Sequence, residues 1–282
     1  MTNVAKKIKT TADQAPSKTP QKQGWKLVFS VFMMLVWVGA SVIVSQLIVG
    51  YAMVGILGAE TFSQPASTAI YSALSYVLAM VLIIFVPMGV SARWHPKSKK
   101  GRESSNGKVG DVEIIRKGLG LSGWPTWTDI GLAPVGFIVY IILAAGATAI
   151  FSIFPWFNAE QAQDVGFSVY STGLDRVIAF FTLVVVAPIA EEIIFRGWLY
   201  GKLREKFNGR MPDRAGMILA ILLVSLLFGI VHLQWNVGVN VFAMSIVLCG
   251  LREITGTIYA GILMHMVKNG VAFYLLYVLG IG

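Results

Sequence analysis

Residues 27–50 read LVFSVFMMLVWVGASVIVSQLIVG and contain no charged side chain. An α-helix needs about 20 mostly apolar residues to cross the hydrocarbon core of a membrane. The stretch therefore predicts a transmembrane helix. It is too long for the apolar region of a cleaved signal peptide, and no clear small-residue cleavage site follows it.

Similar apolar stretches recur along most of the chain. Apolar residues make up 56% of the 282 residues and charged residues only 13%, whereas a soluble domain carries about a quarter charged residues. The composition therefore excludes an ordinary soluble protein and predicts an all-α, polytopic bundle of about seven transmembrane helices, within one of that number. The expected spans are Leu27–Gly50, Thr68–Val90, Ile130–Pro155, Arg176–Tyr200, Gly216–Leu233, Val237–Gly250 and Thr257–Leu279.

The basic residues indicate how the helices are oriented. Six precede the first span, eight lie between the second and third, five between the fourth and fifth, and one between the sixth and seventh, which is 20 of 23. All of them fall on one side if the spans are correct, and basic loops face the cytoplasm. We therefore expect a cytoplasmic N-terminus in the plasma membrane of a prokaryote. The net charge of +9 would then bind membrane lipids and not nucleic acid.

The polar segments divide the chain into three parts. Residues 1–24 are rich in Lys, Thr, Gln and Pro, a composition typical of a disordered tail, which would be cytoplasmic. Residues 25–175 form an N-terminal transmembrane region that includes a basic cytoplasmic loop at 91–128. Residues 176–282 form a C-terminal transmembrane core. The single cysteine, Cys249, excludes an internal disulfide and a cysteine-built metal site.

Ionisable side chains inside the predicted spans are the candidates for function. They are Glu191, Glu192, Arg196, His232, His265 and Lys268. A charge at the centre of a transmembrane helix costs about 2.5 to 3.5 kcal/mol on insertion scales. We therefore expect the three helices that carry these residues to converge in one interior cluster.

Helix geometry sorts the acidic residues. Glu192 and Arg196 are four residues apart and share a face, so they can form an ion pair. Glu191 lies about 100° around the helix from Glu192 and is left free of Arg196. Pro188 cannot donate a backbone hydrogen bond, which leaves the carbonyl of Val184 without its partner and loosens the helix.

The other two helices supply histidines and an amide. His265 and Asn269 are four residues apart on one face, as are Phe228 and His232. A free glutamate, two histidines and an amide can activate a water and stabilise an oxyanion. Glu191, His232 and His265 could equally hold a divalent metal such as zinc with an open water position. The residues leave both alternatives open, so the cofactor is either none or a metal.

Together these residues resemble a known family. AEEIIFRG, FGIVH and HMVKN follow the pattern EExxxR, FxxxH and HxxxN of the CAAX prenyl protease and bacteriocin-processing intramembrane proteases, also called the ABI or CPBP family. The similarity covers roughly Arg176 to the C-terminus. It implies that Glu191 and His232 activate the catalytic water, that His265 and Asn269 form the oxyanion site, and that Arg196 is structural, with Glu192 and Phe228 in support.

The resemblance implies an intramembrane endopeptidase with a cavity open to the cytoplasm. Its substrate would be a hydrophobic, prenylated or leader peptide, hydrolysed as a metalloprotease or as a metal-free glutamate protease. The alternative is a non-proteolytic bacteriocin-immunity or regulatory protein on the same scaffold. A transporter would also use buried charges, but it would be expected to have inverted repeats, and the sequence shows none.

Overall fold

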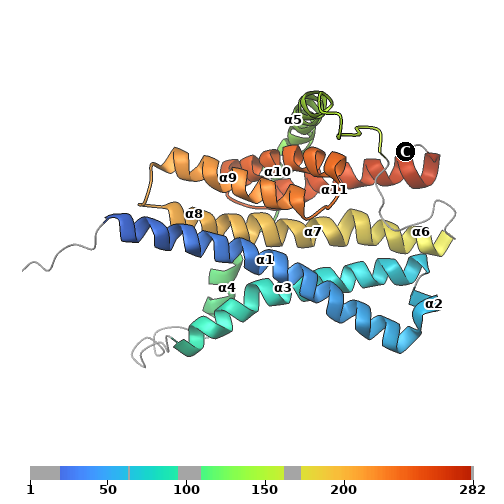
Figure 1. Cartoon of the computed structure of the whole chain (residues 1–282), viewed down its shortest axis with the longest axis horizontal. Helices are drawn as coiled ribbons and strands as arrows, with labels where there is room; N and C mark the ends of the chain where they lie inside the picture. Colours follow the sequence, from blue (N-terminus) through green and yellow to red (C-terminus); the bar gives the residue numbers. More distant parts are fainter. Residues whose placement is uncertain (1–19, 63, 95–108, 162–172, 281–282) are drawn as a thin grey trace, which may run out of the picture.

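The computed structural model describes residues 20–62, 64–94, 109–161 and 173–280, and among these residues it contains helices and no strands. The helices follow one another along the chain as α1 (Pro20–Leu57), α2 (Ala59–Phe62), α3 (Pro65–Trp94), α4 (Val109–Gly118), α5 (Trp127–Phe151), α6 (Gly173–Phe180), η2 (Phe181–Val186), α7 (Ala187–Glu191), η3 (Glu192–Tyr200), α8 (Gly201–Phe207), α9 (Asp213–Ile230), α10 (Trp235–Thr255), α11 (Tyr259–Phe273) and η4 (Tyr274–Leu279) (Figure 1).

Seven of the described helices are long and apolar enough to cross a membrane. They are Gly24–Leu57, Pro65–Met88, Trp127–Phe151, Gly173–Phe207, Asp213–Ile230, Trp235–Thr255 and Tyr259–Leu279. Each contains most of one predicted span, and the sixth continues beyond its predicted end at Gly250 to Thr255. The prediction of an all-α, polytopic bundle with about seven spans is confirmed, and the chain is an integral membrane protein.

Residues 1–19 of the predicted tail lie outside the described residues, as do 95–108 of the basic loop. Helix α1 begins at Pro20, so it extends a few residues into the segment assigned to the tail. Helix α5 begins with a capping box, in which the side chains of Thr126 and Asp129 bond each other's backbone N–H. This motif satisfies two backbone donors that the first turn of a helix leaves free.

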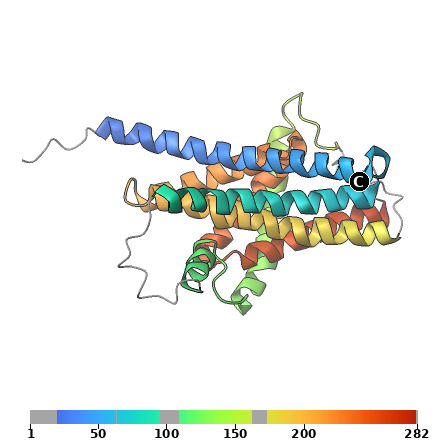
Figure 2. The ribbon, with the colours of Figure 1, turned by 90° about the horizontal axis from the view of Figure 1, so that it is seen from below.

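The continuous helix formed by α6, η2, α7, η3 and α8 runs through the middle of the molecule. Helices α1 and α3 lie on one side of it, and α9, α10 and α11 lie on the other (Figures 1 and 2). Helix α10 packs against α5 and α9, and α11 packs against α5 and η2. The central helix therefore contacts both halves of the bundle.

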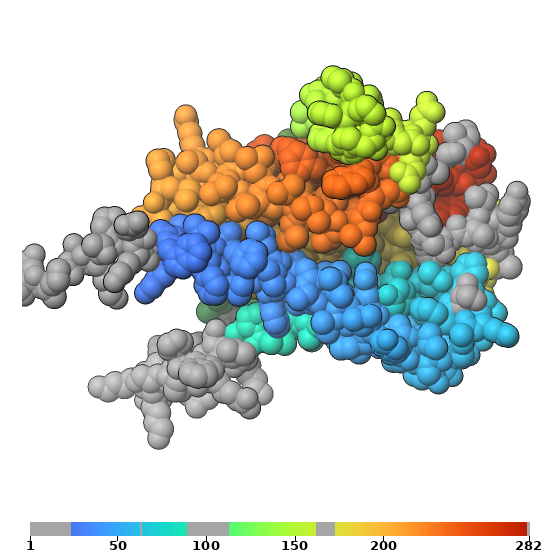
Figure 3. Space-filling view, viewed as in Figure 1, coloured from blue at the N-terminus to red at the C-terminus, as the bar shows by residue number. Residues whose placement is uncertain are grey.

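The outer helices expose apolar side chains over most of their length. Helix α5 stands out from the surface in Figure 3, and its exposed side chains include Ile138 and Ile142. Lipid tails are as apolar as these side chains, so such a surface suits a membrane environment.

Candidate active site

The central helix changes its hydrogen-bond pattern around Pro188. Segments η2 and η3 are π-helical, with the short α-helix α7 between them. In η2 the N–H of Ala187 bonds the carbonyl of Thr182, five residues earlier. The prediction that Pro188 loosens this helix is confirmed, because π-helical turns are wider than α-helical turns.

The π-helical register shifts the carbonyl that Pro188 leaves without a partner. In a π-helix the nitrogen of Pro188 faces the carbonyl of Leu183, and proline has no N–H to donate. The side-chain amide of Asn269 in α11 donates to this carbonyl over 2.8 Å. The expected unpaired carbonyl was that of Val184, which assumed an α-helical register. Asn269 thus holds the central helix against α11 with one of its two N–H groups.

Glu192 and Arg196 form the predicted ion pair inside the bundle. Arg196 Nη1 donates to Glu192 Oε1 over 2.8 Å, and both side chains are fully buried. The guanidinium carbon of Arg196 lies 4.4 Å from the centre of the Phe228 ring. The ion pair and the face of the aromatic ring therefore take the place of the water that would otherwise solvate these two charges.

His265 joins both glutamates to α11. Its Nδ1 lies 3.1 Å from Glu192 Oε1, and its Nε2 lies 3.7 Å from Glu191 Oε2. Gly261, one turn earlier in α11, allows this approach, because a Cβ there would lie 3.0 Å from Glu192 Oε2. The ring of His265 is 2% exposed, so its orientation is defined by the two carboxylates.

Tyr76 is a site residue that the sequence did not reveal. Its hydroxyl, carried by α3, donates to Glu191 Oε1 over 2.5 Å. Tyr76 is one of two tyrosines in the apolar span Pro65–Met88, and no spacing distinguishes it from a packing residue. Among the described residues Arg196 pairs with Glu192 and not with Glu191, as the helix position of Glu191 predicted, and Glu191 is held between Tyr76 and His265.

His232 lies just beyond the end of α9, in the turn to α10. Its Nδ1 is 2.7 Å from the carbonyl oxygen of Phe228. Because a carbonyl can only accept, Nδ1 carries the proton, and Nε2 of the neutral ring keeps its lone pair. The next residue, Leu233, has φ of 57°, a strained conformation for a side chain of this size.

The close crossing of α9 and α10 places His232 beside the cluster. At Gly229 a Cβ would lie 2.9 Å from the carbonyl oxygen of Gly238, and at Gly238 a Cβ would lie 3.0 Å from that of Gly229. Small residues let two transmembrane helices approach closely. The rings of Phe228 and His232 lie 5.0 Å apart, and those of Phe228 and His265 lie 6.1 Å apart.

The predicted convergence of three helices is confirmed. The structure brings Glu191, Glu192, Arg196, Phe228 and His265 into contact, with His232 against Phe228. Asn269 lies one turn beyond His265 but binds Leu183. Its predicted oxyanion role would use its second N–H group.

The alternative of a metal centre does not fit the arrangement of these side chains. Both ring nitrogens of His265 face carboxylates, and Nδ1 of His232 faces a carbonyl. Within the described residues, no three His, Cys, Asp or Glu side chains are grouped closely enough to hold a metal ion. We therefore derive no chemical step through a metal.

One comparison with known proteins finds a relationship. Residues 173–271 match the family model described as type II CAAX prenyl endopeptidase Rce1-like. The match begins at α6 and ends in α11, so it includes Glu191, Glu192, Arg196, Phe228, His232, His265 and Asn269. No curated protein and no solved structure matches the chain significantly.

Proposed function

We propose that the protein is an intramembrane endopeptidase with Glu191 as its general base, because residues 173–271 match the family model of Rce1-like type II CAAX prenyl endopeptidases. The observation that carries the proposal is the arrangement of Glu191, held by Tyr76 Oη at 2.5 Å and facing His265 Nε2 at 3.7 Å. A buried carboxylate with two such neighbours is oriented for proton transfer.

In the proposed reaction Glu191 removes a proton from water, and the hydroxide adds to the carbonyl carbon of the peptide bond. His232 assists through the lone pair on Nε2, which its contact with the Phe228 carbonyl supports. The second N–H of Asn269 donates to the developing oxyanion, while His265, whose ring nitrogens face both carboxylates, lies beside this site one turn earlier in α11. The C–N bond then breaks as Glu191 returns the proton to the amine, which releases a carboxylate and a new N-terminus.

Glu192 and Arg196 have a positioning role in this mechanism. Glu192 Oε1 contacts both Arg196 and His265, so it orients the imidazole through an ion pair that is itself buried. The substrate is a hydrophobic peptide bound at the membrane, and a prenylated peptide is the first class to test, because the matched family is described by that activity.

The test is cleavage of prenylated and unmodified hydrophobic peptides by the purified protein in detergent. The wild type should cleave, and Glu191→Ala and His232→Ala should each lose at least about a hundredfold in kcat/KM, the lower range for a general acid–base group. Glu205→Ala is the matched control, because its side chain is 63% exposed and, within the described part of the chain, forms its ion pair with Lys202 at the surface.

A chelator arm tests the metal alternative separately. We expect full activity after treatment with a strong zinc chelator. If wild type and Glu191→Ala are equally stable and neither cleaves any peptide, the proposal fails, and a binding or regulatory protein on the same scaffold becomes the better interpretation.

A further inference from the structure

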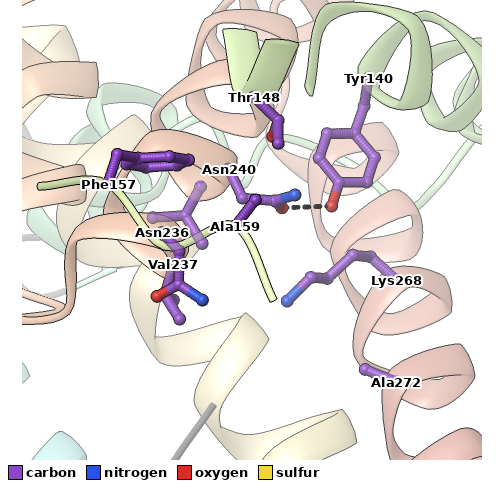
Figure 4. Close-up of a pocket in the computed structure, with 10 residues that line it drawn as sticks. Tyr140, Thr148, Phe157, Ala159, Asn236, Val237, Asn240, Lys268 and Ala272 are labelled. Carbon is purple, nitrogen blue, oxygen red and sulfur yellow. Dashed lines mark hydrogen bonds between the residues drawn. The ribbon is translucent and has the colours of Figure 1, made fainter. Parts of the chain in front are cut away.

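A cavity of about 270 Å³ lies beside the proposed active site and contains a lysine that the mechanism does not use. The side chains that line it come from the outer end of α5, the loop after it, the first turns of α10, and α11. They include Tyr140, Phe157, Asn236, Asn240 and Lys268, as Figure 4 shows. The cavity is close to the lower end, about 300 Å³, of the range for small-ligand pockets.

Lys268 is the unusual member of this lining. It lies inside the seventh span, and its amine points into the cavity (Figure 4). Among the described residues it has neither an ion pair nor a hydrogen bond, although Glu191 is near enough to act on it electrostatically. A lysine in a membrane span is costly and marks a functional site unless a partner neutralises it.

The rest of the cavity is polar on the side that faces Lys268. The hydroxyl of Tyr140 donates to Asn240 Oδ1 over 2.5 Å. Asn236 donates from Nδ2 to the carbonyl of Gln161, whereas its Oδ1 is buried and has no partner among the described residues. The cavity thus offers one unpaired cation and one unpaired hydrogen-bond acceptor.

The N-terminus of α10 adds to the positive potential. This helix of 21 residues begins at Trp235 and has no side-chain cap. Its first N–H groups therefore lack intrahelical partners, and its dipole favours an anion at this end. Asn236 and Val237, from the same turn, line the cavity.

The cavity and the proposed active site share helix α11. His265 and Lys268 are three residues apart in α11, so their Cβ atoms are about 5 to 6 Å apart on neighbouring positions of the helix surface. His232 also lies within electrostatic range of Lys268. A peptide with its scissile bond at Glu191 could therefore reach Lys268 within a few residues, at about 3.3 to 3.6 Å per extended residue.

We propose that this cavity is a substrate subsite in which Lys268 binds a carboxylate of the peptide and Asn236 Oδ1 accepts a hydrogen bond from a backbone N–H of the same peptide. The inference rests on the proposed peptidase function. The carboxylate is either the C-terminus of the substrate or an acidic side chain near the cleaved bond. Either carboxylate carries the negative charge that would pair with the ammonium group of Lys268.

The subsite lies toward the loop after α5, because Thr148, Phe157 and Ala159 line it. This loop is on the side of the bundle opposite the basic loops. A carboxylate that occupies the subsite would therefore point away from the predicted cytoplasmic face, which differs from the expectation of a cavity open to the cytoplasm.

The experiment compares wild type with Lys268→Met and Lys268→Arg on three forms of one fluorescent, farnesylated peptide. The first form has a free C-terminus, the second has an amidated C-terminus, and the third is amidated but carries an added glutamate. On the form that supplies the carboxylate, Lys268→Met should raise KM at least tenfold with kcat changed less than threefold. Lys268→Arg should retain most of the wild-type preference, and the first and third forms identify the source of the carboxylate.

Binding separates failure of this inference from failure of the proposed function. Fluorescence anisotropy with the Glu191→Ala protein measures affinity without cleavage, and the carboxylate forms should bind at least tenfold more tightly than the plain amide. If Lys268→Met weakens all three forms equally, or none of them, the subsite is refuted. If the wild type cleaves no peptide but the anisotropy preference depends on Lys268, the subsite stands and the peptidase is refuted.

Discussion

Helix α1 and the central helix contain apolar stretches of similar hydropathy, but α1 lies at the edge of the bundle and the other helix at its centre. The span Gly24–Leu57 in α1 contains 34 residues, and the central span Gly173–Phe207 contains 35. Within each, a stretch of 18 apolar residues has a mean hydropathy of 2.5 in the first span and 2.2 in the second. Only 17% of the stretch in the first span is buried by protein, compared with 50% of the stretch in the second. Hydropathy therefore identifies both as spans but does not tell which one the others surround.

The charged residues explain the difference. Lipid tails are as apolar as leucine, so burying an apolar face against another helix gains little free energy in a membrane. Glu191, Glu192 and Arg196 cannot face lipid without a large cost, so the helix that carries them is covered. Helix α1 has no such residue in its apolar stretch, and only a few of its side chains, such as Val38 and Ser45, are buried by protein.

The largest effect should come from breaking the buried ion pair. Arg196→Ala leaves Glu192 at zero exposure without its arginine partner, and loss of one partner of a buried pair costs about 3 to 5 kcal/mol. We expect the free energy of unfolding, measured by denaturant titration in detergent, to fall by about that amount. The double variant Glu192→Leu/Arg196→Met should recover much of the loss; a double variant as unstable as Arg196→Ala would contradict the explanation.

Loss of the amide that bridges α11 and the central helix should have a smaller effect. Asn269→Ala removes the hydrogen bond to the Leu183 carbonyl, and hydrogen bonds between transmembrane helices contribute about 0.6 to 1.7 kcal/mol. The free energy of unfolding should fall within that range. Asn240→Ala is a useful comparison. It also removes a hydrogen bond between helices, but the partner of Asn240 is the hydroxyl of Tyr140 and not the carbonyl that faces Pro188. Stability equal to wild type would argue against the role given to Asn269.

The contact between α3 and the central helix can be tested at Tyr76. Tyr76→Phe removes the hydrogen bond that α3 donates to Glu191, and a hydrogen bond to a charged group contributes about 1.5 to 3 kcal/mol. We expect kcat/KM for peptide cleavage to fall about tenfold. Tyr71→Phe, in the same helix but with its ring against Phe62, should leave cleavage unchanged. Equal losses in the two variants would indicate a general disturbance of α3.

The smallest effect should come from the lipid-facing surface of α1. Ile43 is 59% exposed, and substitutions at such positions usually change the free energy of unfolding by no more than about 0.5 kcal/mol. Ile43→Ala should therefore be nearly neutral. Ile83→Ala in α3, where the side chain is fully buried, should cost about 2 to 5 kcal/mol because it leaves a cavity. Similar costs at both positions would mean that α1 is more tightly packed than its exposure implies.

The spacing of residues along single helices predicted the site well. The pair Glu192 and Arg196 was predicted from a separation of four residues, and the loosened helix from Pro188, because both depend on the geometry of one helix. The partner of Glu191 was not predictable in this way. Tyr76 lies on α3, and which side chain of α3 faces the central helix depends on the rotation and crossing of the two helices.

Lys268 and Asn269 show the same limit at neighbouring positions. The sequence identified Lys268 as an unusual charge and Asn269 as a member of a motif, but not what either one contacts. Asn236 and Asn240 are four residues apart in WNVGVN and therefore share one face of their helix. Two amides on one face of a transmembrane helix could have predicted that this face lines a polar cavity. The packing of α5, α10 and α11 was still needed to bring them together with Tyr140.

By itself the sequence determined the class of the protein, its spans and the set of ionisable side chains that must be shielded from lipid. These follow from hydropathy and helical period, which are local properties of the chain. The tertiary structure alone decided that the helix from Gly173 to Phe207 is central, that Asn269 binds the Leu183 carbonyl, and that Lys268 faces a cavity. The reason is that contacts between helices depend on how the helices are rotated and crossed, and a one-dimensional pattern does not contain that information.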